Sequence, residues 1–169
     1  MYKKQVLNFE DYAAHPKAIV EAQEALNGLD MALIAHGMLP SQAACEEDFR
    51  NAQLALTANF LSFASLLTHL ANYFEKQRHG RIGAITSVAG DRGRKDNYVY
   101  ASAKAGVSAW LEGLRGRLAA TGVTVTDIKP GYVDTGASPN QTKPVETVSA
   151  KESDAKKLSK KKHKKLGIL

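Results

Sequence analysis

The sequence contains a single cysteine among its 169 residues, so no internal disulfide can form. Cys45 also has no cysteine or histidine neighbour at the spacing of a metal site. We interpret Cys45 as a small, half-buried residue, and we predict no metal ligands.

Long hydrophobic runs are also missing. No stretch approaches the roughly 18 consecutive apolar residues of a membrane span, and the N-terminal segment MYKKQVLNFEDY lacks the apolar core of a signal peptide. The composition, 44% hydrophobic and 24% charged, is typical of a globular domain. We therefore expect a cytoplasmic protein with a buried core and no membrane span.

Most of the chain has no excess of charge. Residues 1–150 carry 15 basic and 15 acidic side chains, and the net charge of +6 arises in residues 151–169, where eight lysines face Glu152 and Asp154. This lysine run has no interleaved aromatic residues on which bases could stack. We therefore expect no nucleic acid as a partner, and we predict a solvated helix or a disordered tail.

The remaining sequence alternates extended apolar segments with helical patterns. Extended segments are predicted at Gln5 to Asn8, in DMALIAHG, in RIGAITS and in VTVTDIKPG, and helices are predicted up to about Leu26, over 46–76 and over 98–120. Apolar strands between long helices favour a parallel sheet covered on both faces, which is a doubly wound α/β fold. In such a sheet ligands bind beyond the carboxyl ends of the strands, here at the segments that start at His36, Ser87 and Pro130.

The segment SVAGDRGRKDNYVYASAK holds two tyrosines, and only Tyr100 has a lysine four positions later. On a helix, Tyr100 and Lys104 share one face, whereas the corresponding position after Tyr98 is a serine. An ammonium about 6 Å away, at an effective dielectric of ~20, favours the phenolate by roughly 2.8 kcal/mol. The spacing therefore indicates an acid/base tyrosine whose pKa is lowered toward ~8, although the same spacing also occurs by chance.

Two more polar residues join this pair. Ser87 ends a predicted strand thirteen residues before Tyr100, and Asn59 lies within a predicted helix. Each could be an ordinary cap or local hydrogen bond. Together, Asn59, Ser87, Tyr100 and Lys104 resemble the Asn-Ser-Tyr-Lys tetrad of the short-chain dehydrogenase/reductase family. ITSVAG, YASAK and PGYVDT are similar to the motifs of that family, and the resemblance runs from Val6 to Thr135.

The resemblance implies an oxidoreductase that uses NAD or NADP and acts on a small-molecule carbonyl or alcohol. It implies that Tyr100 exchanges the proton, Ser87 binds the substrate oxygen, Lys104 lowers the tyrosine pKa and holds the cofactor ribose, and Asn59 anchors a water relay. The cofactor contacts of the family fall on Asn8, Phe9, Ala35, Gly37, Tyr100, Lys104, Pro130, Gly131, Val133 and Thr135. The family commonly forms oligomers through the helices of Asn59 and Tyr100, so a homo-oligomer is expected.

One feature of the family is absent from the sequence. The family begins with a strand, a Gly-x-x-x-Gly-x-Gly turn and a helix that bind the pyrophosphate, but only seven residues precede Asn8. We therefore expect an N-terminally truncated, incomplete Rossmann-type domain over residues 1–135, a loop and lysine-rich tail over 136–169, and impaired cofactor binding. The first extended segment would be loose or mispaired, and the strand at Leu33 would become an exposed, aggregation-prone edge.

Several alternatives stay open. The chain could be a non-catalytic module that pairs with a full-length relative, or, less favoured, a basic-tailed binding protein. Residues 88–106 are similar to reductases that act on decaprenylphosphoryl keto-pentose, so the substrate could be sugar-linked. Arg92, Arg94 and Lys95 could meet a phosphate or sugar-linked anion, or could form an ordinary solvated loop. His36 could touch the cofactor or be structural.

Overall fold

The computed structural model describes residues 6–131, 133 and 166–168. The helices are α1 (His15–Leu26), α2 (Gln42–Glu47), α3 (Phe49–Leu56), the π-helical turn η1 (Thr57–Leu61), α4 (Ser62–Gln77), the 3-10 turn η2 (Val88–Asp91) and α5 (Tyr98–Leu118). The strands are β1 (Met31–Ile34), β2 (Gly80–Ile85), β3 (Val123–Ile128) and β4 (Leu166–Ile168).

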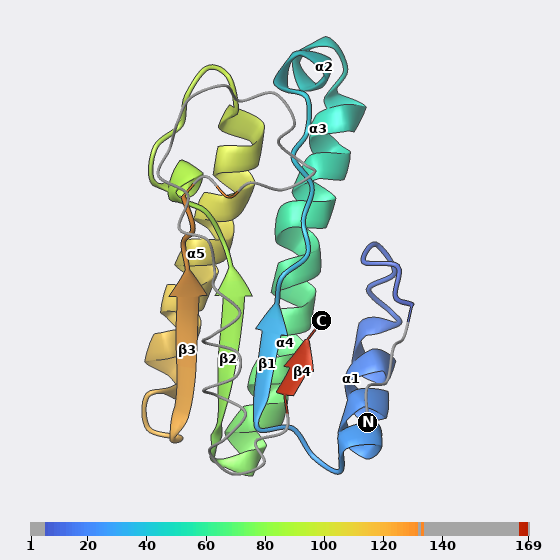
Figure 1. Ribbon diagram of the computed structural model, residues 1–169, viewed down its shortest axis with the longest axis vertical. Coiled ribbons are helices and arrows are strands. Elements are labelled where there is room, and N and C mark those ends of the chain that lie inside the picture. Colours follow the sequence, from blue (N-terminus) through green and yellow to red (C-terminus); the bar gives the residue numbers. More distant parts are fainter. Residues whose placement is uncertain (1–5, 132, 134–165, 169) are drawn as a thin grey trace.

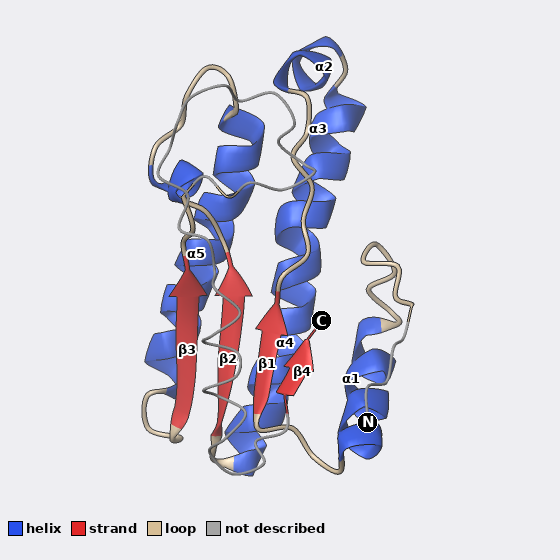
Figure 2. Ribbon diagram, viewed as in Figure 1, coloured by secondary structure: helices blue, strands red, loops and turns tan. Residues whose placement is uncertain are grey.

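The strands form one parallel sheet in the order β3-β2-β1-β4 (Figure 2). The chain moves in one direction across the sheet from β1 to β3, and its two crossovers therefore place α4 and α5 on the same face (Figure 1). Helix α1 packs against α4. The predicted parallel α/β fold is confirmed, and the described helices form the layer on one face of the sheet.

The core lies between the sheet and this layer of helices. Along α4 the fully buried apolar side chains recur at helical spacing, and they meet the inward-facing side chains of the strands. The α4 set is Phe63, Leu66, Leu67, Leu70 and Phe74, and the strand set is Ala32, Ile34, Ile82, Ala84 and Val125. Strand residues alternate between this core and the opposite face.

The continuous helical stretch Phe49–Gln77 is also long and apolar enough, by length and composition alone, to cross a membrane, with a mean hydropathy of 1.4 in its most apolar window. Such a composition is equally expected of a helix in a protein core. The fully buried side chains of α4 belong to this stretch, and their packing against the sheet accounts for its composition.

The helix predicted over residues 46–76 is not one regular helix. Asp48 has an extended backbone between α2 and α3, and its carboxylate accepts a hydrogen bond from the Arg50 amide at 2.9 Å, as a helix cap does. Further along, η1 widens the helix by a π-turn around Asn59. Apolar periodicity did not reveal either feature, because each depends on local polar contacts.

The prediction of an exposed edge at Leu33 was wrong. Residues 6–8 form no strand, in agreement with the expected loose first segment, and Gln5 lies outside the described residues. The edge of β1 is instead covered by β4, with Met31 paired to Leu166 and Leu33 paired to Ile168. The end of the lysine-rich tail is therefore a strand, because β1 offers unpaired backbone groups that a short apolar segment can satisfy. Residues 134–165 lie outside the described residues.

Deleting residues 166–169 is expected to uncover the edge of β1 and to promote self-association. The exposed N–H and C=O groups of Met31 to Ile34 would then be free to pair with another chain. Light scattering at increasing protein concentration would measure the change. The control is deletion of four residues earlier in the tail, 160–163, and equal behaviour of both deletions would contradict the role of β4.

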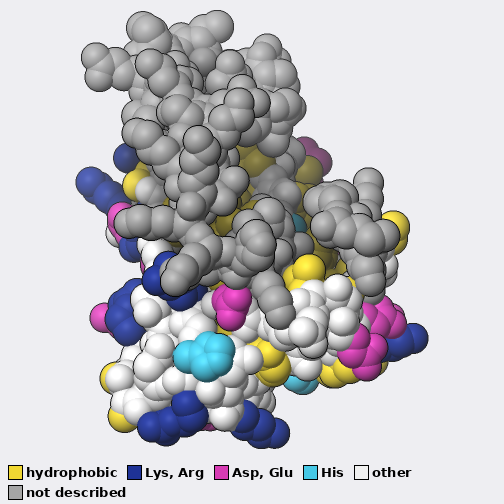
Figure 3. Space-filling view, turned by 60° about the horizontal axis from the view of Figure 1, so that its bottom comes forward, with side chains coloured by type: hydrophobic (Ala, Val, Ile, Leu, Met, Phe, Trp, Pro, Cys, Tyr) yellow, Lys and Arg dark blue, Asp and Glu magenta, His cyan; other side chains and the backbone are white. Residues whose placement is uncertain are grey.

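Basic and acidic side chains are interspersed on the described surface. Figure 3 looks toward the amino ends of the strands and shows Lys and Arg side chains at separate places, with Asp and Glu side chains among them.

Candidate active site

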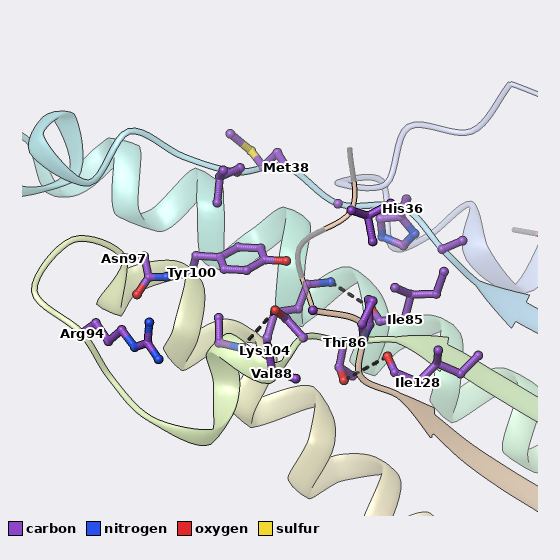
Figure 4. Close-up of a pocket in the computed structure, with 18 residues that line it drawn as sticks. His36, Met38, Ile85, Thr86, Val88, Arg94, Asn97, Tyr100, Lys104 and Ile128 are labelled. Carbon is purple, nitrogen blue, oxygen red and sulfur yellow. Dashed lines mark hydrogen bonds between the residues drawn. The ribbon is translucent and has the colours of Figure 1, made fainter. Parts of the chain in front are cut away.

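A pocket of about 550 Å³ lies at the carboxyl ends of β1, β2 and β3 (Figure 4). Its eighteen lining residues include His36, Ser87 and Pro130, which begin the three segments expected to meet at this edge. Three parallel strands end here and three loops diverge, so the sheet itself creates the concavity.

Most of the predicted site residues line this pocket. Ser87 is among them, as are Ala35, Gly37, Tyr100, Lys104, Pro130, Gly131 and Val133 from the predicted cofactor set. Asn8 and Phe9 are not in the lining: the Asn8 side chain accepts a hydrogen bond from the Glu10 amide, and the Phe9 ring stacks on His36 at 3.7 Å. Thr135 lies outside the described residues. The roles of all these residues stay predictions.

Ser87 lies between the end of β2 and the start of η2. The Thr86 amide donates to the Ile128 carbonyl at 2.8 Å and the Val88 amide donates to the Pro130 carbonyl at 3.3 Å, so the contact between β2 and β3 continues on both sides of Ser87. The Ser87 hydroxyl accepts a hydrogen bond from the Ala89 amide at 3.1 Å, and its own proton remains available to another acceptor.

Tyr100 projects into the pocket from the first turn of α5 (Figure 4). Burial raises the pKa of the Tyr100 phenol, and hydrogen bonding with Ser87 acts in the opposite direction. The predicted lowering of this pKa by Lys104 is therefore wrong for this structure. The reason is that burial disfavours the phenolate, while the Lys104 ammonium lies 5.8 Å from the centre of the tyrosine ring.

Lys104 is only 3% exposed, one helical turn after Tyr100. Its Nζ donates to the Ile85 carbonyl at 3.0 Å and lies 4.4 Å from the centre of the Phe63 ring. Burial lowers the pKa of Lys104 to about 8, while Asp127 opposes the shift. The side chain therefore carries its positive charge in most molecules at neutral pH, inside the pocket wall.

Asn59 does not line the pocket but holds the loop that does. It is fully buried in η1; its Nδ2 donates to the Met38 carbonyl at 2.9 Å, and its Oδ1 accepts from the Met38 amide at 3.0 Å. A Cβ at Gly37 would lie 2.9 Å from the Asn59 Oδ1 and 3.5 Å from the Lys104 Nζ. Only glycine leaves room for this approach, so Asn59, Gly37 and Lys104 form one packed unit.

Replacing Gly37 with alanine is expected to shift this loop and to destabilise the fold by about 1 to 3 kcal/mol, as overpacking commonly does. Gly131→Ala is the matched control, because Gly131 also lines the pocket but a Cβ there meets no described residue within 4 Å. Urea unfolding of both variants provides the comparison. Equal urea midpoints for the two variants would show that a Cβ at position 37 can be accommodated beside Asn59.

The His36 ring is held in place by contacts with other side chains. Its Nε2 lies 2.7 Å from the Ser62 hydroxyl, which itself donates to the Ala58 carbonyl, so Nε2 carries the ring proton. Burial, followed by the charge of Lys104, lowers the pKa of His36 to about 4. The ring is therefore neutral at physiological pH, and it stacks on Phe9 at the edge of the pocket.

Some lining residues were not expected from the sequence. Asn97 and Met38 line the pocket, as does Thr86, whose hydroxyl donates to the Asp127 carboxylate at 2.5 Å. Thr86 directly precedes Ser87, and this adjacency was the sequence signal that could have placed Thr86 in the pocket. Across the described residues no group of three or more His, Cys, Asp or Glu side chains is arranged to hold a metal ion.

Comparison with known proteins gives a consistent set of relatives. The family described as short chain dehydrogenase matches residues 3–146. An uncharacterized oxidoreductase of Mycobacterium tuberculosis (strain H37Rv) is 36% identical over 124 residues, covering 73% of this chain and 50% of that protein. Ketoacyl reductase HetN of Nostoc sp. is 29% identical over 115 residues, covering 68% and 40% respectively. This chain thus spans about half the length of these curated relatives.

Solved structures with a similar fold include that of a dehydrogenase. The crystal structure of an NAD+-bound xylitol dehydrogenase superposes with a TM-score of 0.72 at 21% sequence identity, covering 78% of this chain and 51% of that one. At this level of identity the likeness concerns the fold alone.

Proposed function

The chain belongs to the short chain dehydrogenase family, and on this basis we propose that its pocket transfers hydride between a nicotinamide cofactor and a small ketone or alcohol. The observation that supports this proposal is the position of Ser87, Tyr100 and Lys104 in one pocket at the carboxyl ends of parallel strands. A hydroxyl, a phenol and an ammonium at that place provide the groups that carbonyl reduction requires.

The pocket residues fit the nicotinamide end of the cofactor. The ammonium of Lys104 has three N–H donors, and one of them is directed to the Ile85 carbonyl, so others can serve ribose hydroxyls. Gly37 and Gly131 expose backbone to the pocket. The family's glycine-rich turn has no counterpart in the given sequence. When bound, the cofactor would supply or accept the hydride at the substrate carbon, and the residues do not decide between NAD and NADP.

The proton in this proposal comes from Tyr100. Its raised pKa keeps the phenol protonated at neutral pH, so the phenol can donate to a ketone oxygen as that oxygen gains negative charge. Ser87 would donate a hydrogen bond to the same oxygen, and the ammonium of Lys104 would stabilise the tyrosinate that remains. Asn59 would support this arrangement by holding the loop, and its part in a water relay is also proposed. The raised pKa favours reduction over alcohol oxidation.

Fluorescence titration with NADPH and NADH, followed by an assay of ketone-dependent oxidation of the bound cofactor, tests the proposal. Micromolar binding with turnover would support it. Failure of both cofactors to bind, together with co-purification of a longer relative, would contradict it and favour the non-catalytic interaction module. A cytoplasmic location and a decaprenylphosphoryl keto-pentose substrate remain finer predictions within this proposal.

We also propose a homo-oligomer formed through the helices that carry Asn59 and Tyr100. Large apolar side chains are exposed on both: Leu54 and Leu61 on α3 and η1, and Trp110 on α5. Trp110→Asp is expected to reduce the oligomeric mass measured by light scattering, because it places a charge in an apolar contact. Val20→Asp is the control, since Val20 is 48% exposed on α1. An unchanged mass for Trp110→Asp would contradict this interface.

A further inference from the structure

The pocket is positively charged. Among the eighteen lining residues that the structure describes there is no Asp or Glu, and the basic side chains are Arg94, Lys104 and His36, whose low pKa keeps its ring neutral. Positive charge in a concave site attracts anionic ligands. A ligand of this pocket is therefore expected to bring negative charge of its own.

The two positive charges are placed differently. Lys104 is buried in the wall and donates to the Ile85 carbonyl. Arg94 is exposed, and its guanidinium makes no hydrogen bond or ion pair with the residues described in the structure. Asp91, on the same loop, is already paired with Lys129 at 2.6 Å. Within the part of the chain that the structure describes, Arg94 is thus a lining cation with no side-chain partner.

Arg94 lies at a distinct end of the pocket. Figure 4 shows Tyr100 and Lys104 between His36 on one side and Arg94 with Asn97 on the other. Asn97 precedes α5 but its side chain does not cap the helix, and its Oδ1 finds no donor among the described residues. This end of the pocket therefore presents the Arg94 guanidinium beyond the phenol of Tyr100, while the Asn97 Oδ1 is buried.

We propose that Arg94 is a specificity-determining residue, which binds a carboxylate or phosphate group carried by the carbonyl substrate. The anion would lie at the loop end of the pocket while the carbonyl oxygen lies between Ser87 and Tyr100. An arginine is suited to this because its fork of N–H donors can bind two oxygens of one anion. This inference depends on the proposed carbonyl reduction for the identity of its ligand.

Binding alone can test the inference without turnover. The full chain is titrated by ¹H–¹⁵N NMR with acetoacetate against methyl acetoacetate, and with dihydroxyacetone phosphate against dihydroxyacetone. The amides of Ser87 and Tyr100 report on the pocket. Arg94→Gln removes the charge, and Arg92→Gln is the matched control, because Arg92 is also exposed on this loop but does not line the pocket.

In the unsubstituted chain and in Arg92→Gln, the anionic member of at least one pair is expected to bind about fivefold to tenfold more tightly. The pair with the larger preference identifies carboxylate or phosphate as the anion. In Arg94→Gln this preference should fall to about twofold or less, while binding of the neutral member is unchanged.

Three results would overturn the inference: no preference in the unsubstituted chain, a preference that survives in Arg94→Gln, or an Arg94→Gln effect confined to NADP+ binding, which would assign Arg94 to the cofactor. An inactive chain that keeps the Arg94-dependent preference would contradict the proposed hydride transfer and support the anion site. Turnover of ketones without any anion preference would support the proposed hydride transfer and contradict the anion site.

Discussion

Replacing Tyr100 with phenylalanine is expected to lower kcat/KM for ketone reduction by a factor of about 10² to 10⁴, because the substrate oxygen loses its proton donor. The ring remains in place, so the half-buried packing of this side chain should change little. Cofactor binding is expected to change by less than about threefold, since a single neutral hydrogen bond to the cofactor contributes modestly. Steady-state kinetics with NADPH and the ketone that gives the fastest cofactor oxidation provide the measurement.

The neighbouring tyrosine is the matched control for this substitution. Tyr98 lies on the same first turn of α5, is 44% exposed and does not line the pocket. Tyr98→Phe removes the same hydroxyl without touching the proposed chemistry, and it should retain activity within about twofold. Equal losses in both variants, or full activity in Tyr100→Phe, would exclude Tyr100 as the proton donor.

The second large effect is a pH dependence of stability that originates in Lys104. Burial lowers the pKa of this ammonium from 10.5 to about 8, so the folded protein binds its proton less tightly than the unfolded chain does. Below pH 8 both states hold the proton, and the full cost of burying the charge is present. Between pH 8 and 10.5 the folded state has lost a proton that the unfolded state keeps, and stability therefore rises with pH.

The rise is at most about 3 to 4 kcal/mol, at about 1.4 kcal/mol for each pKa unit of difference. Denaturant unfolding at pH 7, 8 and 9 measures the lower part of this rise, and stopping at pH 9 keeps Tyr100 protonated in the unfolded chain, where its ordinary pKa is about 10. Lys104→Met keeps the unbranched stem and removes the charge, so its unfolding free energy should lack this increase. The two proteins are compared by how their unfolding free energies change with pH and not by the absolute values, because Lys104→Met also removes the donor to the Ile85 carbonyl. Parallel slopes for the two proteins would contradict the buried ammonium.

Local sequence patterns were sufficient for much of the site. Tyr100 and Lys104 could be placed on one face because the spacing of four residues is a property of any helix. The meeting of His36, Ser87 and Pro130 could be predicted because parallel strands end at a common edge of their sheet. The contacts of Asn59 with Met38 could not, because they depend on a π-turn and on a loop 21 residues away.

The sequence by itself determined a parallel α/β fold with a serine, a tyrosine and a lysine at the strand ends, since helical spacing and strand apolarity act over a few neighbouring residues. Only the tertiary structure decided that β4 covers the edge of β1 and that the pKa of Tyr100 is raised. The physical reason is that strand pairing and burial are set by residues distant in the chain. An ammonium one helical turn away lowers the pKa of a phenol only if its attraction for the phenolate exceeds the cost of removing that phenolate from water.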